Sequence, residues 1–244
     1  MRRWVKGILF VTAGLFLTLQ FSGCAQVATG IEHAKLETSA KMSKTVFLNP
    51  VRPDQKTIFV QVKSTSQVPM PNLQSDIVNY LTAKGYEIIQ DPYKAHYWLQ
   101  TNVLYMGKET KHLTMAGALA GGFGGALIGS AFGSGYGKLG AMGVGSMIGT
   151  GLGMIAGAAI HVDKYMGIVD VQVKEKVNGN IQAKMTSNLK QGTGTTYHTT
   201  RTLNTSYQAY RTRVAAEATQ TNMNLKEDIP VLENKIAREL AGIF

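Results

Sequence analysis

The sequence predicts an α+β fold, in which a small sheet with packed helices is interrupted by a glycine-rich transmembrane helical hairpin. Strand and helix patterns alternate in residues 46–113 and again in residues 161–244. Between them, residues 114–160 hold 16 of the 27 glycines and only one charged side chain, Lys138. The formal net charge is +10, yet only 16% of residues are charged, which excludes a disordered polyelectrolyte.

The N-terminus has the pattern of a lipoprotein signal peptide. Three basic residues precede an apolar stretch at 8–19 that is too short to span a bilayer, and small residues then lead to Cys24. This arrangement resembles the bacterial lipobox, in which the chain is cleaved before a cysteine that receives acyl chains. An ordinary secretory signal with a chance cysteine is the alternative. We therefore expect a signal peptide at 1–23 and a lipidated tether, able to become helical, at 24–45. By its resemblance to sorted bacterial lipoproteins, a cysteine that is not followed by aspartate implies lipid anchoring in the outer membrane.

The first half of the predicted domain has the order strand, helix, strand, strand. A β-branched, partly alternating stretch at 57–63 predicts the first strand. Apolar residues at helical spacing follow Asn72 and stop before Gly85, which predicts a helix with a glycine at its C-terminal end. Alternating patterns at 86–90 and 97–105 predict two further strands.

The second half of the domain begins with a strand that has one apolar and one solvated face. Valines at 169, 171, 173 and 177 alternate there with Asp170, Gln172, Lys174 and Lys176. The pair Asn178 and Gly179 then predicts a type I′ hairpin turn. Residues 193–212, rich in threonine, tyrosine and arginine, predict a strand with a solvated face, and residues 229–244 predict a C-terminal amphipathic helix.

The glycine-rich middle divides into two apolar pieces, 115–133 and 139–160, joined by residues 134–138. As helices they would be about 28 and 33 Å long, and a bilayer hydrocarbon core is roughly 30 Å thick. We therefore expect each piece to cross a membrane once. A flexible linker would be polar and serine-rich, which this segment is not. A buried helical hairpin inside the globular domain is a further alternative.

Glycine recurs every fourth residue through both pieces, with one alanine in the series. This spacing leaves a stripe without side chains, on which another helix backbone can approach closely in lipid. The predicted helix-packing ridge consists of Gly117, Gly121, Gly125, Gly129, Gly133, Gly145, Gly149, Gly153 and Gly157. Because one hairpin cannot bury both its ridge and its flanks, we expect a closed homo-oligomer. Few polar residues lie inside the spans, which favours an assembly that does not conduct ions.

The sequence shows no catalytic, metal-binding or cofactor-binding motif. The five histidines have no paired ligand spacing, and the single cysteine is assigned to lipid. No Gly-Lys-Ser/Thr sequence completes a phosphate-binding loop. We therefore expect neither an enzyme nor a nucleic-acid partner. The positive net charge instead favours outer-membrane lipid, in particular the phosphates of lipopolysaccharide.

Several strings of residues resemble the TraT lipoproteins of conjugative plasmids. They are MSKTVFLNP at 42–50, IFVQVKSTS at 58–66, AKGY at 83–86, AHYWLQTNVL at 95–104, YRTRV at 210–214 and PVLE at 230–233. The resemblance implies a surface-accessible, oligomeric outer-membrane lipoprotein without catalytic activity. It also implies two roles: surface exclusion, which makes the host a poor recipient for a related plasmid, and resistance to killing by serum complement.

If both predicted helices cross the membrane, the tip at 134–138 faces outward. Tyr136 and Lys138 are then the candidate recognition residues for a pilus or adhesin of a donor cell. The tip could equally be only a tight turn at the lipid headgroups. A structural or channel-forming lipoprotein of a secretion or export assembly is the alternative function.

Overall fold

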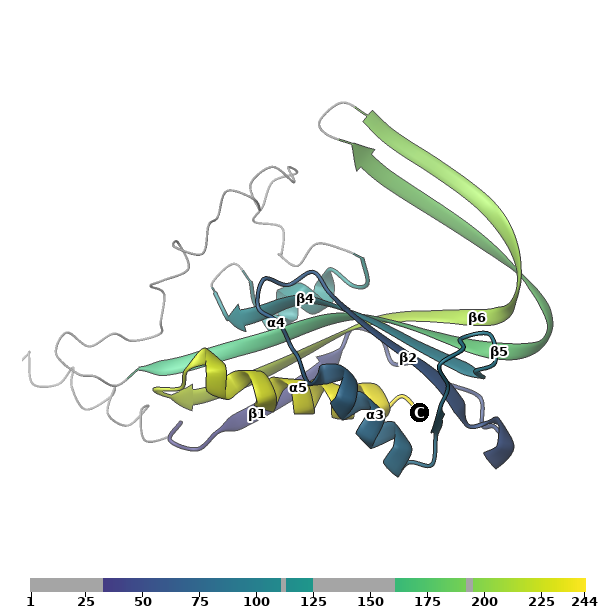
Figure 1. The fold of residues 1–244 in the computed structure, drawn as a ribbon. Helices are drawn as coiled ribbons and strands as arrows, with labels where there is room; N and C mark the ends of the chain where they lie inside the picture. The colour runs from purple at the N-terminus through teal and green to yellow at the C-terminus, as the bar shows by residue number, and fades with distance from the viewer. Residues whose placement is uncertain (1–32, 111–112, 125–160, 192–194) are drawn as a thin grey trace, which may run out of the picture.

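The computed structural model describes residues 33–110, 113–124, 161–191 and 195–244. These residues form a six-stranded sheet of order β1-β6-β5-β4-β2-β3, with α3 and α5 on one face and α4 on the other (Figure 1). In chain order the elements are β1 (Glu37–Met42), the 3-10 turn η1 (Pro53–Gln55), β2 (Thr57–Ser64), α3 (Leu73–Ala83), β3 (Glu87–Ile88), β4 (Tyr97–Lys108), α4 (Met115–Ala120), β5 (Val162–Gln191), β6 (Thr195–Thr221) and α5 (Leu225–Ala241).

The predicted fold class is wrong, because the described chain is mostly β-sheet. The sheet is not small, since β5 and β6 are 30 and 27 residues long and pair with each other along most of their length. The predicted membrane helix that begins at residue 115 ends at Ala120 in the structure. None of the described helices is both long enough and apolar enough to cross a membrane. The second predicted span, 139–160, lies outside the described residues.

The strands and the helix predicted from local periodicity in residues 57–105 are confirmed. Inward-facing residues of β2 and β4 alternate with half-buried ones, as a sheet with one packed face requires. Helix α3 buries Leu73, Ile77 and Leu81, which lie four residues apart on one face. Gly85 follows this helix with a φ of +83°, a left-handed conformation that glycine adopts without steric cost.

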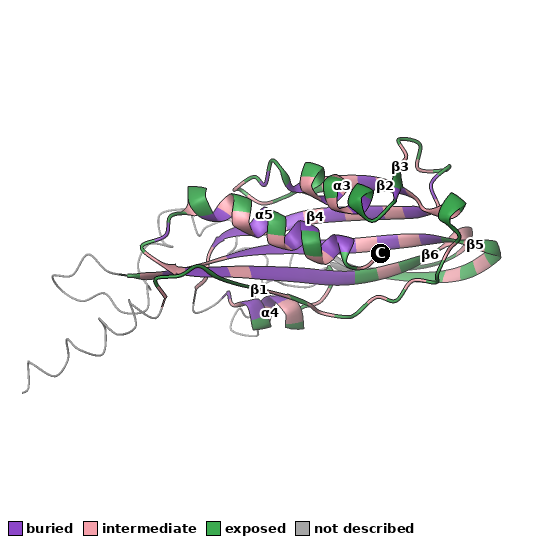
Figure 2. Cartoon of the chain, turned by 90° about the horizontal axis from the view of Figure 1, so that it is seen from below, coloured by how far each residue is buried: buried purple, intermediate pink, exposed green. Residues whose placement is uncertain are grey.

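The main core lies between the sheet and the two helices α3 and α5. Val169, Val171 and Val173 of β5 point into it, as the alternating pattern predicted. Figure 2 shows the inner face of the sheet buried beneath α5 and α3, whose outer surfaces are exposed. A smaller apolar cluster lies on the opposite face, where α4 covers Met166, Ile168 and other side chains.

The N-terminal edge of the sheet comes from residues expected to be a tether. Residues 37–42 form β1 rather than a helix, and β1 pairs antiparallel with β6 from Glu37↔Thr219 to Met42↔Val214. Ala40 and Met42 pack against the main core, which accounts for the ordered strand. The N-terminal strand is therefore held by the last strand of the sheet.

The hairpin turn predicted at Asn178 and Gly179 is also wrong. At this point β5 continues, and residues 177–180 lie opposite the single residue Ser206 in a β-bulge, where Gly179 has a φ of +104°. Beyond the bulge the two strands extend as a two-stranded ribbon, residues 181–191 and 195–205, which we call the arm. The arm bends away from the rest of the sheet (Figure 1). Among the described residues, neither outer edge of the arm pairs with another strand.

Candidate functional site at the start of the glycine-rich segment

The glycine-rich segment begins on the second face of the sheet, at α4. Thr114 precedes this helix, and its side-chain oxygen accepts a hydrogen bond from the backbone N–H of Gly117 at 3.1 Å. Met115 and Ala118 are buried against β5 and β6. The small side chain of Ala118 lets the helix lie directly on the sheet. The start of the segment is therefore a packed part of the domain.

A buried ion pair lies beneath α4. Arg213 of β6 and Asp170 of β5 are direct neighbours in the sheet register, and Arg213 is fully buried. The guanidinium donates from Nε to Asp170 Oδ1 at 2.6 Å and from Nη2 to Oδ2 at 3.2 Å. This bidentate geometry suits an arginine–carboxylate pair and offsets part of the cost of removing both charges from water.

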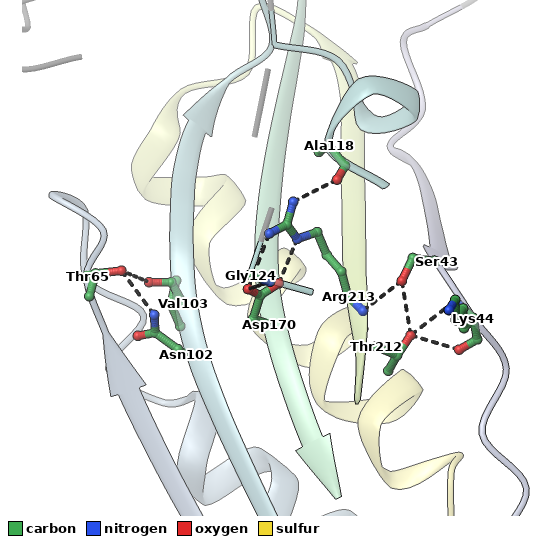
Figure 3. A network of polar contacts seen from close by, with 10 residues as sticks. All are labelled: Ser43, Lys44, Thr65, Asn102, Val103, Ala118, Gly124, Asp170, Thr212 and Arg213. Carbon is green, nitrogen blue, oxygen red and sulfur yellow. Dashed lines mark hydrogen bonds and ion pairs between the residues drawn. The ribbon is translucent and has the colours of Figure 1, made fainter. Parts of the chain in front are cut away.

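Both members of the ion pair also hold the backbone of the glycine-rich segment. Arg213 Nη1 donates to the carbonyl oxygen of Ala118 at 2.9 Å, and the N–H of Gly124 donates to Asp170 Oδ2 at 2.8 Å (Figure 3). We call Arg213, Asp170 and these two backbone contacts the clamp. It fixes the chain on both sides of the end of α4. A charged pair is well suited to this, because each charge strengthens its hydrogen bond to the backbone.

Glycine has a backbone role in the clamp. Gly122 and Gly124 have φ values of +59° and +69°, at which residues other than glycine are strained. Gly117 lies inside α4, and Gly121 is the C-cap of this six-residue helix. The structure therefore shows a short helix and a turn at these glycines, in place of the long helix that the predicted ridge requires.

The chain that follows β1 is tied to the same part of β6. Ser43 Oγ accepts a hydrogen bond from the N–H of Arg213 at 2.9 Å. The hydroxyl of Thr212 donates to the carbonyl of Lys44 at 2.7 Å and accepts from the N–H of Lys44 at 3.2 Å. Figure 3 shows these contacts beside the clamp. The N-terminal strand and the glycine-rich segment are therefore attached at adjacent residues of one strand.

A row of polar side chains crosses the same face next to the clamp. Gln100 donates to Gln61 at 3.0 Å, Gln172 donates to Gln100 at 3.0 Å, and Arg211 donates from Nε to Gln172 at 2.8 Å. We call this row the glutamine ladder. Its members come from β2, β4, β5 and β6. At its end the Arg211 guanidinium lies over the ring of Phe123, 5.4 Å from the centroid.

A second buried charged cluster lies where the chain enters β5. Asp163 is almost fully buried, forms an ion pair with Lys108, and lies with Oδ2 2.8 Å from His161 Nε2. Asp228 of α5 is fully buried, and neither of its carboxylate oxygens accepts a hydrogen bond from a described residue. Burial, together with the nearby charges of Asp163 and Glu227, raises the pKa of Asp228 to about 7.

Most of the sequence-predicted site residues lie outside the described part of the chain. These are Cys24, Gly125, Gly129, Gly133, Tyr136, Lys138, Gly145, Gly149, Gly153 and Gly157. The alternating pattern placed Asp170 on the solvated face of its strand, and this was wrong, because α4 covers both Asp170 and its partner Arg213. Their opposite charges on neighbouring strands were the available signal, but nothing local gives the register that pairs them. In the described residues, no group of three or more His, Cys, Asp or Glu side chains could hold a metal ion.

Comparison with known proteins gives a family match over most of the chain. Residues 35–244 match the model described as "Enterobacterial TraT complement resistance protein". A TraT complement resistance protein of Escherichia coli is 35% identical over 249 residues, covering 97% of this chain and 98% of that protein. One from Escherichia coli strain K12 is also 35% identical, with the same coverage of both chains.

Two further similarities are more limited. A TraT complement resistance protein of Wigglesworthia glossinidia brevipalpis is 38% identical over 82 residues, or 34% of each chain. Among solved structures, a PelC variant that forms a dodecamer, from Paraburkholderia phytofirmans, aligns with 85% of this chain and 98% of its own. Its TM-score of 0.25 and sequence identity of 11% are too low to support an argument. The match to the family model and the near full-length relatives confirm the resemblance seen in the sequence, and the chain belongs to the TraT complement resistance protein family.

Proposed function

We propose that this protein is an outer-membrane lipoprotein of a conjugative plasmid that mediates surface exclusion and contributes to complement resistance. The observation that carries the proposal is the family match, which extends over 97% of the chain and includes every element of the sheet domain. The lipobox-like pattern supports anchoring by acyl chains on Cys24. The glycine-rich segment has no part in this anchoring proposal.

The attachment of β1 supports a function at a membrane surface. The proposed lipid anchor precedes β1, and the residues after β1 are bonded to β6 beside the clamp. The clamp in turn holds the start of the glycine-rich segment. A lipidated N-terminus would therefore keep this face of the sheet, with its apolar segment, close to the membrane.

The arm supports self-association. An isolated two-stranded ribbon is marginally stable in water, so a long arm is expected to be covered in the working protein. One face of the arm carries the half-buried apolar residues Ile181, Ala183 and Leu203, and the register adds Thr205, Met185 and Arg201 to the same face. The opposite face carries exposed polar side chains, including the pair Gln182 and Asn204. We therefore propose a homo-oligomer in which the apolar face of the arm packs against a neighbouring copy.

The mass of the detergent-solubilised particle tests this assembly. The variant Ile181→Ser with Leu203→Ser is expected to shift the particle toward single chains, because it makes the apolar face of the arm polar. Gln182→Ser with Asn204→Ser is the matched control on the opposite face and should keep the wild-type mass. Light scattering gives the mass, and circular dichroism confirms that each variant is folded. An unchanged mass in the first variant would exclude the arm as the interface.

A mating assay tests the proposed function. Recipient cells that express the protein should take up a related plasmid less often than cells with an empty vector, and should survive serum better. Cys24→Ser is expected to remove both effects, because an unacylated chain has no proposed attachment to the membrane. Immunoblots of whole cells establish that each variant is present in equal amount, and immunoblots of membrane fractions report whether it is attached to the membrane. Full exclusion and serum survival in cells that express Cys24→Ser would contradict the lipid-anchored mechanism. Normal plasmid uptake by recipients that express the wild-type protein would contradict surface exclusion.

A further inference from the structure

A pocket lies beside the clamp, between the chain that follows β1 and the end of α4. It has a volume of about 560 Å³, within the range of small-ligand sites. Its lining residues are Ser43, Lys44, Leu119, Ala120, Gly122, Phe123 and Arg211. Two of them are cations and none is acidic. The pocket therefore combines positive charge with apolar side chains.

Arg211 is held in a fixed orientation beside the pocket. Its Nε donates to Gln172, which the glutamine ladder fixes in turn, and its guanidinium lies over Phe123. Neither Nη atom donates a hydrogen bond within the described part of the chain. An arginine fork that is already oriented binds a phosphate group through two hydrogen bonds with little loss of side-chain entropy.

Other charges near the pocket make it more favourable for an anion. Lys44 is exposed, and its backbone is fixed by two hydrogen bonds to Thr212. The neighbouring carboxylate of Asp170 is paired with Arg213 and adds no net negative charge to the region.

The apolar lining residues of the pocket narrow the class of ligand. Phe123 is 39% exposed, and it lines the pocket together with Leu119 and Ala120 of α4. A free inorganic anion would leave this surface in contact with water, whereas an amphiphile would cover it. The two cations match a phosphate, and the apolar side chains match the first methylenes of an acyl chain.

We propose that this pocket binds the anionic phosphate headgroup of a membrane lipid. Arg211 and Lys44 contact the phosphate, and Leu119, Ala120 and Phe123 contact the glycerol and upper acyl region. The inference rests on the proposed function, because it places this face of the domain at a membrane. Lipid binding at the pocket would hold the start of the glycine-rich segment at headgroup depth, next to the clamp.

Native mass spectrometry of the full mature protein in detergent tests the site, with phosphatidic acid and phosphatidylcholine as probes. Wild-type protein should bind phosphatidic acid in preference to phosphatidylcholine. Lys44→Gln with Arg211→Gln should weaken phosphatidic acid binding about tenfold or more, because the charged hydrogen bonds are lost. Arg52→Gln with Lys63→Gln is the matched control: both residues are exposed and neither lines the pocket. It changes the net charge equally and should bind phosphatidic acid like the wild type.

Three results would overturn the proposal. Equal weakening in both double variants would show general charge attraction, and equal binding of the two lipids would show that the headgroup charge is not recognised. Displacement of phosphatidic acid by a similar concentration of inorganic phosphate would assign the pocket to a free anion. The lipid-binding result is independent of the mating and serum assays, because it uses purified protein and those assays use intact cells. Loss of protection with intact lipid binding would refute the proposed function and leave the site in place.

Discussion

Replacing Arg213 with methionine is expected to lower the free energy of unfolding by about 3 to 5 kcal/mol, because it leaves the carboxylate of Asp170 buried without its partner. Methionine keeps a long apolar side chain beneath α4, so the loss is mainly electrostatic. The carbonyl of Ala118 also loses its donor. Urea denaturation of the mature protein in detergent, followed by circular dichroism, measures the change.

The double variant Arg213→Met with Asp170→Leu separates the two possible causes. If the unpaired charge is responsible, removing it as well should restore much of the stability, because a buried ion pair replaced by apolar side chains is often neutral. The backbone at Gly124 would still lack its acceptor, so recovery should be incomplete. A double variant as unstable as Arg213→Met alone would show that the ion pair is not what supports this region.

Asp228→Asn is expected to change how stability depends on pH. The folded protein holds the Asp228 proton up to about pH 7, whereas the ordinary pKa of an aspartate, expected in the unfolded chain, is 3.8. Between these values the folded state binds one more proton than the unfolded state, so stability falls as pH rises, by about 1.4 kcal/mol per pH unit. The asparagine variant cannot lose this proton, and its stability should be flatter over the same range.

Above pH 7 the asparagine variant should therefore be more stable than the wild type, by roughly 1 to 3 kcal/mol after the cost of a buried amide is deducted. The groups that face Asp228 are Asp163, Tyr165 and Glu227, and Lys108 and His161 are paired with Asp163. Glu227→Gln is the control, since it removes an exposed neighbouring charge and should leave most of the pH slope. Equal slopes for wild type and Asp228→Asn between pH 4 and 7 would refute the raised pKa.

Local sequence patterns correctly predicted the strands and helices that pack one face against the core. The valines of β5, the four-residue spacing in α3 and the left-handed Gly85 each reflect one element packed on one face. The pair Asn178 and Gly179 is an equally strong local signal for a turn. It forms a β-bulge here because β5 and β6 remain paired on both sides of it. A turn signal specifies a conformation at two residues and does not determine the course of the chain beyond them.

The candidate site could not be predicted because its parts are distant in the sequence. Asp170 and Arg213 meet only when β5 and β6 have paired in register, and the backbone that they hold precedes both. Small residues every four positions are compatible with a long helix, yet Gly122 and Gly124 adopt positive φ values because the clamp turns the chain there. Within the described residues 113–124, the periodicity therefore described the composition correctly and the conformation incorrectly.

The pairing of β1 with β6 has a consequence for the order of folding. Glu37 lies opposite Thr219, so the first strand finds its partner only after nearly the whole domain has been synthesised. Contacts between residues so far apart form late, since closing such a loop carries a large entropic cost. If the chain is exported and acylated as proposed, the acylation site would precede a strand that is still unpaired. The modifying enzymes would therefore meet an extended, accessible chain before the sheet closes.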